Sequence, residues 1–124
     1  MIMVDSDIII WILRGKNEFL DELENKINEQ NESLFITPIQ IPEILSGTRA
    51  SEMEDTDRMM KSFNILDINE NIGKIAGKYL KKYRKSHGIT LADSLIAASA
   101  ILNKTKLWTL NRKHYPMLSE ESFE

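Results

Sequence analysis

Four short apolar segments alternate with stretches of helical periodicity, and this alternation constrains the fold more than any other feature of the chain. The predicted strands are residues 2–4, 34–36, 64–66 and 106–108. Short strands that alternate with helices form a parallel sheet covered by helices on both faces. We therefore predict an α/β protein, a three-layer α/β/α sandwich with a central, mostly parallel sheet, in which residues 1–124 form a single domain.

The predicted helices lie between these strands. Apolar residues recur at helical spacing over residues 19–27, 41–45 and 72–83, and Met59, Met60 and Phe63 predict the end of a further helix. Gly47 and Gly88 are the expected helix ends. Residues 90–102 are apolar on nearly all sides, which is typical of a helix packed by several neighbours. Ligands of such folds bind beyond the carboxyl ends of the strands.

Three acidic residues interrupt segments that this fold should bury. Asp5 directly follows the first strand. Glu43 is the only charged residue between positions 33 and 48, and Asp93 is the only one between positions 89 and 103. Burial of a carboxylate costs several kcal/mol unless another interaction offsets the cost. The three acids therefore need an explanation.

Each acid alone has an ordinary structural interpretation. Asp93 with Thr90 resembles a helix capping box, Glu43 fits a solvated helix face, and Asp5 fits a turn. The alternation, however, places Asp5 and Asn111 directly after strands, and Glu43 and Asp93 one turn into helices. All four are then expected at one edge of the sheet.

Clustered carboxylates predict a metal site. Two of them about 4 Å apart repel by roughly 4 kcal/mol at an effective dielectric near 20. A divalent cation removes this conflict, and oxygen ligands favour Mg²⁺ or Mn²⁺ over zinc. We predict that Asp5, Asp93 and Glu43 bind the metal.

Composition narrows the function classes. The chain has no cysteine, which excludes disulfides, thiolate zinc sites and cysteine nucleophiles and fits a cytoplasmic protein. No signal peptide is visible, and the longest apolar stretch, residues 8–13, is too short to cross a bilayer. A net charge of −3 argues against a simple nucleic-acid binder, which should be basic, but permits a nuclease that neutralises its acids with metal.

Four segments together resemble the PIN-domain family, in particular its VapC-type toxins. They are residues 4–10 (VDSDIII), 39–47 (IQIPEILSG), 91–98 (LADSLIAA) and 107–115 (LWTLNRKHY). They stand in the family's order and spacing, and the resemblance runs from Met1 to about Leu118.

The resemblance implies a Mg²⁺- or Mn²⁺-dependent endoribonuclease that hydrolyses RNA with Asp5, Glu43, Asp93 and Asn111 as catalytic residues. It also implies the toxin role in a type II toxin–antitoxin pair, with a small VapB-like antitoxin as partner and a homodimer as the usual assembly. The sequence departs from the family at Asn111, where many members carry Asp. The lower charge weighs against a second bound metal.

Several neighbours of these acids receive supporting roles. Ser6 and Thr109 are expected to orient the metal ligands through their hydroxyl groups. Asp7 either joins the metal ligands or starts the first helix, and we favour the helix start. Arg112 and Lys113 adjoin the site and are expected to bind substrate.

A basic run and a histidine have less direct interpretations. The run on the long helix is Lys78, Lys81, Lys82, Arg84 and Lys85. Such a run is usually a solvated face, and guidance of phosphate is the minority interpretation. His114 either contacts the substrate or has a structural role in its loop, and we favour the structural role.

Three other functions remain open. A PIN-type nuclease can process RNA outside a toxin–antitoxin pair. A PIN fold can also bind RNA or protein without catalysis, although intact Asp5, Glu43 and Asp93 speak against this. A phosphorylation-receiver domain likewise gathers acids at strand ends, and Asp67 is the nearest acceptor candidate. No phosphate-binding loop of the GxxxxGK type is present.

Overall fold

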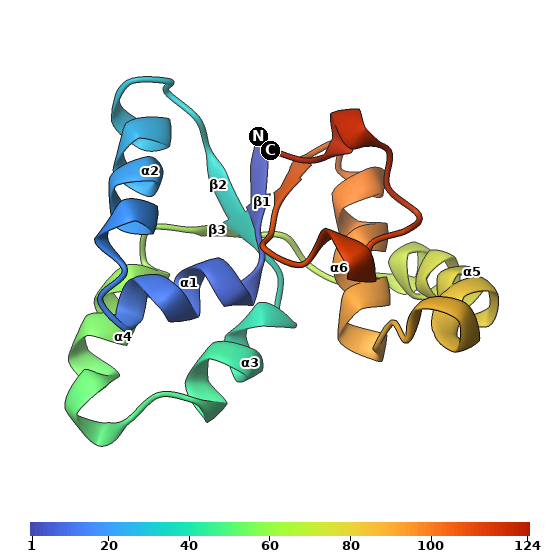
Figure 1. The fold of residues 1–124 in the computed structure, drawn as a ribbon, viewed down its shortest axis with the longest axis horizontal. Helices are drawn as coiled ribbons and strands as arrows, with labels where there is room; N and C mark the ends of the chain where they lie inside the picture. The colour runs from blue at the N-terminus through green and yellow to red at the C-terminus, as the bar shows by residue number, and fades with distance from the viewer.

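The computed structural model describes all residues from 1 to 124 and contains one sheet of four parallel strands (Figure 1). The strands are β1 (Ile2–Val4), β2 (Leu34–Ile36), β3 (Asn64–Ile65) and β4 (Lys106–Trp108). They lie in the order β3-β2-β1-β4, and every pair is parallel. The predicted α/β architecture is confirmed, with a sheet that is parallel throughout.

Six α-helices connect and cover the strands. They are α1 (Ser6–Leu13), α2 (Asn17–Asn28), α3 (Gln40–Ser46), α4 (Met53–Met60), α5 (Glu70–His87) and α6 (Leu91–Leu102). Short 3-10 turns occur at Ala50–Glu52, Arg112–His114 and Glu120–Ser122. None of the helices combines the length and the apolar character that crossing a bilayer requires.

The two faces of the sheet bury different helices. On β1, Ile2 and Val4 belong to the core that contains α1 to α3, whereas Met3 points into the core beneath α6. On β4, Trp108 belongs to the core with α1 to α3, and Leu107 belongs to the core beneath α6. This alternation follows from the two-residue period of a strand. Figure 1 shows the resulting layers, with α1 to α4 on one side of the sheet and α6 and α5 on the other.

The helix predicted to close with Phe63 ends earlier than expected. Helix α4 stops at Met60, and Phe63 follows a turn and lies immediately before β3. Its side chain is buried in the core with Met60 packed against that core. Apolar spacing alone does not distinguish a last helical turn from a buried residue that precedes a strand.

Polar side chains define the helix starts near the carboxyl edge of the sheet. Asp5 caps α1 by accepting a hydrogen bond from the Ser6 amide. The interpretation of Asp7 as the residue that starts this helix is therefore wrong, since Asp7 lies inside its first turn. Thr90 caps α6 and forms a capping box with Asp93. Gly88 ends α5 in the left-handed conformation, with φ of 63°.

Candidate active site

The site begins where two adjacent strands end. Val4 pairs with Trp108 in the sheet, and the Asp5 amide continues the ladder by donating to the Trp108 carbonyl at 2.9 Å. The next residue of each strand, Asp5 or Thr109, then emerges at the same edge. The parallel pairing of β1 with β4 thus joins two segments that lie more than a hundred residues apart.

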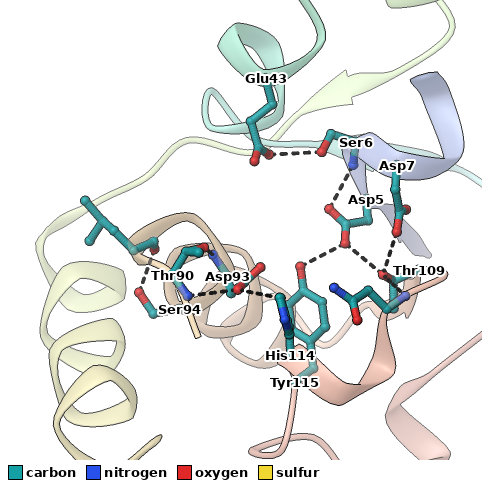
Figure 2. A network of polar contacts seen from close by, with 12 residues as sticks. Asp5, Ser6, Asp7, Glu43, Thr90, Asp93, Ser94, Thr109, His114 and Tyr115 are labelled. Carbon is teal, nitrogen blue, oxygen red and sulfur yellow. Dashed lines mark hydrogen bonds and ion pairs between the residues drawn. The ribbon is translucent and has the colours of Figure 1, made fainter. Parts of the chain in front are cut away.

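Asp5 is fixed by hydrogen bonds from three sides. Its Oδ1 accepts from the Ser6 amide at 2.8 Å. Its Oδ2 accepts from Thr109 Oγ1 at 2.8 Å and from the Tyr115 hydroxyl at 2.9 Å (Figure 2). The residue is 7% exposed. Asp5 is therefore a buried, oriented carboxylate and not an ordinary turn residue.

Glu43 and Asp93 approach Asp5 from two other helices. Glu43, in the first turn of α3, accepts a hydrogen bond from Ser6 Oγ at 3.0 Å. Asp93 accepts from the Thr90 amide at 2.9 Å and pairs with His114 Nδ1 at 3.2 Å. Figure 2 shows the carboxylates of Glu43, Asp5 and Asp93 directed toward one another. Asp93 is thus both a capping residue and a member of the cluster.

Asp7 forms a fourth carboxylate beside Asp5. Its Oδ1 accepts from the Ile8 amide at 2.7 Å, and its Oδ2 accepts from the Leu110 amide at 3.1 Å. Burial, reinforced by the negative charge of Asp5, raises the pKa of Asp7 to about 6. Asp7 therefore connects the start of α1 to the loop that follows β4.

The acids destabilise one another's charged forms. Burial raises the pKa of Asp5 although Thr109, Tyr115 and Ser6 donate hydrogen bonds to it, and the charge of Asp93 raises it further. Burial also raises the pKa of Glu43, with further increases from the charges of the neighbouring aspartates. No lysine or arginine forms an ion pair with any of the four acids. The site therefore concentrates negative charge without a cationic side chain to balance it.

The donor set suits a hard divalent cation in its chemistry. Carboxylate oxygens are the ligands that Mg²⁺ and Mn²⁺ prefer, and hydroxyl groups already orient two of the carboxylates. In this conformation no three acidic or histidine side chains lie close enough to hold one ion together. Shared coordination therefore requires the side chains to move inward. Glu43, which is only half-buried and long, has the freedom to do so.

Asn111, predicted as a catalytic residue, and the predicted substrate residues Arg112 and Lys113 form no hydrogen bond or ion pair with the side chains of the four acids. Asn111 is exposed, and its backbone N–H donates to Thr109 Oγ1 at 3.1 Å. Arg112 pairs with Glu120 at 3.3 Å and donates to the Glu124 carbonyl at 3.2 Å, so its guanidinium lies against the C-terminal segment. Lys113 is exposed. The roles of all three in binding or catalysis stay predictions.

Two residues at the site were not singled out from the sequence. The hydroxyl of Tyr115 contacts Asp5, and the ring is 1% exposed. Gln40 is fully buried, accepts from the Thr37 amide at 3.0 Å and donates to the Val4 carbonyl at 3.2 Å. It ties the start of α3 to the end of β1 and so positions Glu43. The signal for Gln40 was an uncharged polar residue inside an apolar segment that the fold buries, whereas the sequence around Tyr115 carries no such signal.

His114 makes a polar contact outside its own loop. A structural role was predicted for it, and its ring contacts Asp93 in the first turn of α6. The contact joins the segment after β4 to the start of α6. His114 is thus part of the polar network around the acids.

The geometry defines a class of protein, a parallel α/β domain with an acidic site at the carboxyl edge of its sheet. The PIN domain family model matches residues 2–116, so the chain belongs to the PIN-domain family. It is 36% identical over 121 residues to Ribonuclease VapC10 of Mycobacterium tuberculosis, an alignment that covers 97% of this chain and 90% of the relative. Ribonuclease VapC19 of the same species is 32% identical over 97% of this chain and 96% of the relative.

Comparison of structures gives the same fold. A toxin–antitoxin complex from Klebsiella pneumoniae contains a chain that superposes with a TM-score of 0.77 at 24% identity. The superposition covers 100% of this chain and 96% of that one. The predicted PIN-like fold and the resemblance to VapC-type proteins are therefore confirmed.

Proposed function

We propose that this chain is a Mg²⁺- or Mn²⁺-dependent endoribonuclease and the toxin of a VapBC-like type II toxin–antitoxin pair. The observation that carries the proposal is the approach of Asp5, Glu43 and Asp93 at one edge of the sheet, with no basic side chain except His114 in contact with them. The names of the two relatives, both ribonucleases, support the same activity.

Asp5, Glu43 and Asp93 would hold the metal. A bound divalent cation supplies Lewis-acid stabilisation of the phosphoryl oxygens. The reaction is hydrolysis of a phosphodiester, in which a water oxygen bonds to phosphorus, a phosphorus–oxygen ester bond breaks, and the leaving oxygen takes up a proton. Ser6, Thr109 and Tyr115 keep the carboxylates oriented. Asn111, beside Thr109, would bind water or complete the metal's surroundings.

The partners follow from the same proposal. The substrate is RNA, and a small VapB-like antitoxin would cover the site; the assembly is a homodimer that acts in the cytoplasm. The toxin–antitoxin complex with the same fold supports the antitoxin partner. A short neighbouring reading frame with a DNA-binding start would favour the toxin role over an RNA-processing nuclease outside such a pair.

The receiver-domain alternative has little support in the structure. Asp67, its acceptor candidate, is exposed and follows β3, which is an edge strand. A receiver needs its acceptor after a central strand, in contact with the other acids. None of the pKa shifts of the clustered acids involves Asp67.

The test is an RNA cleavage assay with Mg²⁺, with Mn²⁺ and with EDTA. We compare the wild type with Asp93→Asn and with the control Asp67→Asn, which removes an equal charge outside the cluster. Asparagine can keep the hydrogen bond from the Thr90 amide, so α6 should retain its cap. We expect cleavage to need a metal and to be lost only in Asp93→Asn. Metal-independent cleavage that survives Asp93→Asn would refute the proposal.

A further inference from the structure

Positive charge is concentrated on one helix of a protein that is otherwise strongly acidic. Helix α5 carries six basic side chains and one acidic one, a net charge of +5. The rest of the chain has ten basic and 18 acidic side chains, a net charge of −8. A separation of charge on this scale creates a local field that attracts an anionic partner.

Four lysines of α5 form a single stripe. Lys74, Lys78, Lys81 and Lys85 follow one another at intervals of four, three and four residues, which places them on one side of the helix. At a rise of 1.5 Å per residue the stripe is about 16 Å long. The opposite side of α5, with Ile72 and Ala76, packs against α6. The stripe therefore faces solvent.

The stripe is almost free of internal ion pairs. Lys74 lies 3.8 Å from Glu70, and no other lysine of the stripe has a carboxylate within 4.0 Å. Basic side chains in the last turn of a helix interact favourably with the helix dipole, and this interaction accounts for Lys85 and its neighbour Arg84. That effect is confined to the last turn, so it does not account for Lys74, Lys78 and Lys81.

The position of α5 connects this charge to the candidate active site. Helices α5 and α6 pack together, and Gly88–Thr90 is the whole of the connection between them (Figure 1). Lys85 therefore lies near the end of α5 that leads directly to Asp93 in the first turn of α6. The end of the stripe at Lys85 is thus the end of α5 from which the chain continues to Asp93.

Without a bound cation the acids repel a phosphodiester chain, so basic side chains outside the cluster must attract it. Arg112 directly follows Asn111 in the sequence, but its guanidinium pairs with Glu120 and donates to the Glu124 carbonyl. Helix α5 carries the largest group of basic side chains available for this attraction.

We propose that the stripe of Lys74, Lys78, Lys81 and Lys85 binds the phosphate backbone of single-stranded RNA beside the cleaved bond. This inference rests on the proposed nuclease function. The lysines contact phosphates and not bases, so they contribute affinity without sequence preference. They hold the RNA strand along α5 while a neighbouring phosphate lies at the acids.

The test compares two triple variants of equal charge. One changes Lys78, Lys81 and Lys85 to Gln, and the other changes Lys16, Lys61 and Lys104 to Gln, three exposed lysines on other elements. Binding of a fluorescently labelled single-stranded RNA is measured by anisotropy in EDTA, so that the RNA is not cut. Glutamine has nearly the helix propensity of lysine, and circular dichroism verifies that α5 remains intact.

We expect the α5 variant to bind RNA more weakly and to depend less on salt. The slope of log affinity against log salt should decrease by about 0.7 for each lost contact, or about 2 in total. In metal-containing cleavage assays the loss should appear as a higher KM. The control variant should keep the slope and the KM of the wild type.

Two results would overturn the inference. One is an α5 variant that binds the RNA with the same affinity and salt dependence as the control. The other is a loss of binding to duplex DNA or to the antitoxin with RNA binding unchanged, which would assign the stripe to another partner. If the wild type cleaves RNA in either case, the proposed function stands. Binding that depends on the stripe in a protein that never cleaves RNA would refute only the nuclease.

Discussion

The hydroxyl of Tyr115 donates a hydrogen bond of 2.9 Å to Oδ2 of Asp5, a residue 110 positions earlier in the chain. Both side chains are buried, and the same carboxylate oxygen also accepts from Thr109. Burial raises the pKa of Asp5, and these two hydrogen bonds partly counteract it. The hydrogen bond from Tyr115 thus favours the ionised form of Asp5, which burial disfavours.

Tyr115→Phe should weaken metal binding without unfolding the protein. Loss of a hydrogen bond to a metal ligand typically reduces metal affinity or activity about 10- to 100-fold. We expect the concentration of Mn²⁺ that gives half-maximal RNA cleavage to increase within this range. Tyr79→Phe is the matched control, because Tyr79 lies on α5 and makes no contact with the acids. Equal metal dependence of the two variants would contradict the role given to Tyr115.

The raised pKa of Asp7 predicts the direction of a pH effect on stability. Its pKa rises from 3.8 to about 6 on folding. Between these values the folded protein keeps a proton that the unfolded chain has lost, so an increase in pH lowers the free energy of unfolding. Asp5 and Glu43 shift in the same direction. Without divalent cations, the melting temperature should therefore decrease from about pH 4 to about pH 6 and change less above it.

Asp7→Asn checks the assignment of this effect. Asparagine retains a carbonyl oxygen for the Leu110 amide but carries no charge. The variant should melt at a higher temperature than the wild type at neutral pH and at a similar temperature near pH 4. A constant difference across the whole range would show that Asp7 does not titrate as proposed.

Glu43→Gln should have opposite effects on stability and on activity. The substitution removes one of the mutually repelling charges, and glutamine can still accept from Ser6. We expect a higher melting temperature in EDTA, a smaller stabilisation by added Mg²⁺, and a loss of cleavage of at least about 100-fold. Glu22→Gln on α2 removes an exposed acid far from the cluster and should change none of these. A Glu43→Gln variant with full activity would exclude Glu43 from the site.

Asn111→Asp tests whether charge limits the number of metals. The backbone N–H of residue 111 donates to Thr109 Oγ1, and Thr109 donates to Asp5 and Asp7, so the substitution adds a negative charge close to the cluster. We expect half-maximal cleavage at a lower Mn²⁺ concentration and a melting temperature that is lower in EDTA, because another negative charge joins the cluster. Asn111→Ala is the comparison that removes the amide without adding charge. An identical metal titration for wild type and Asn111→Asp would place residue 111 outside the site.

Gly88→Ala should destabilise the protein through the backbone alone. Gly88 has φ of 63°, and a Cβ there would meet nothing within 4 Å. Because the added methyl group makes no clash, the only cost in the alanine variant is that of the left-handed backbone conformation, about 1 kcal/mol of stability. Gly88→Asn should lose less, since asparagine tolerates this conformation. Equal stability of the three proteins in chemical denaturation would contradict this explanation.

The strands and the acids were predictable because both follow simple rules. Alternating apolar segments locate β1, β2 and β4 within the sequence, and parallel strands end at a common edge. Glu43 and Asp93 stood out because each is an isolated charge in an apolar stretch, and Asp5 stood out because it directly follows an apolar strand. The structure places all three at that edge.

The hydrogen-bond partners were harder to predict because they depend on distant packing. Nothing local distinguishes Tyr115 from a core tyrosine, and its contact with Asp5 arises only when the loop after β4 folds over β1. Asp7 was misassigned because the capping role fell to the preceding acid, Asp5. Arg112 follows Asn111 directly, yet Glu120 and Glu124 draw its side chain to the C-terminal segment.

The central place of β1 has a consequence for synthesis of the protein. Its partner strands β2 and β4 start about 30 and about 100 residues later, and the ribosome makes the chain from the N-terminus. A nascent or truncated polypeptide that stops before Lys106 lacks both β4 and the hydroxyl groups of Thr109 and Tyr115 that hold Asp5 in position. Incomplete products of translation therefore lack an assembled acidic site.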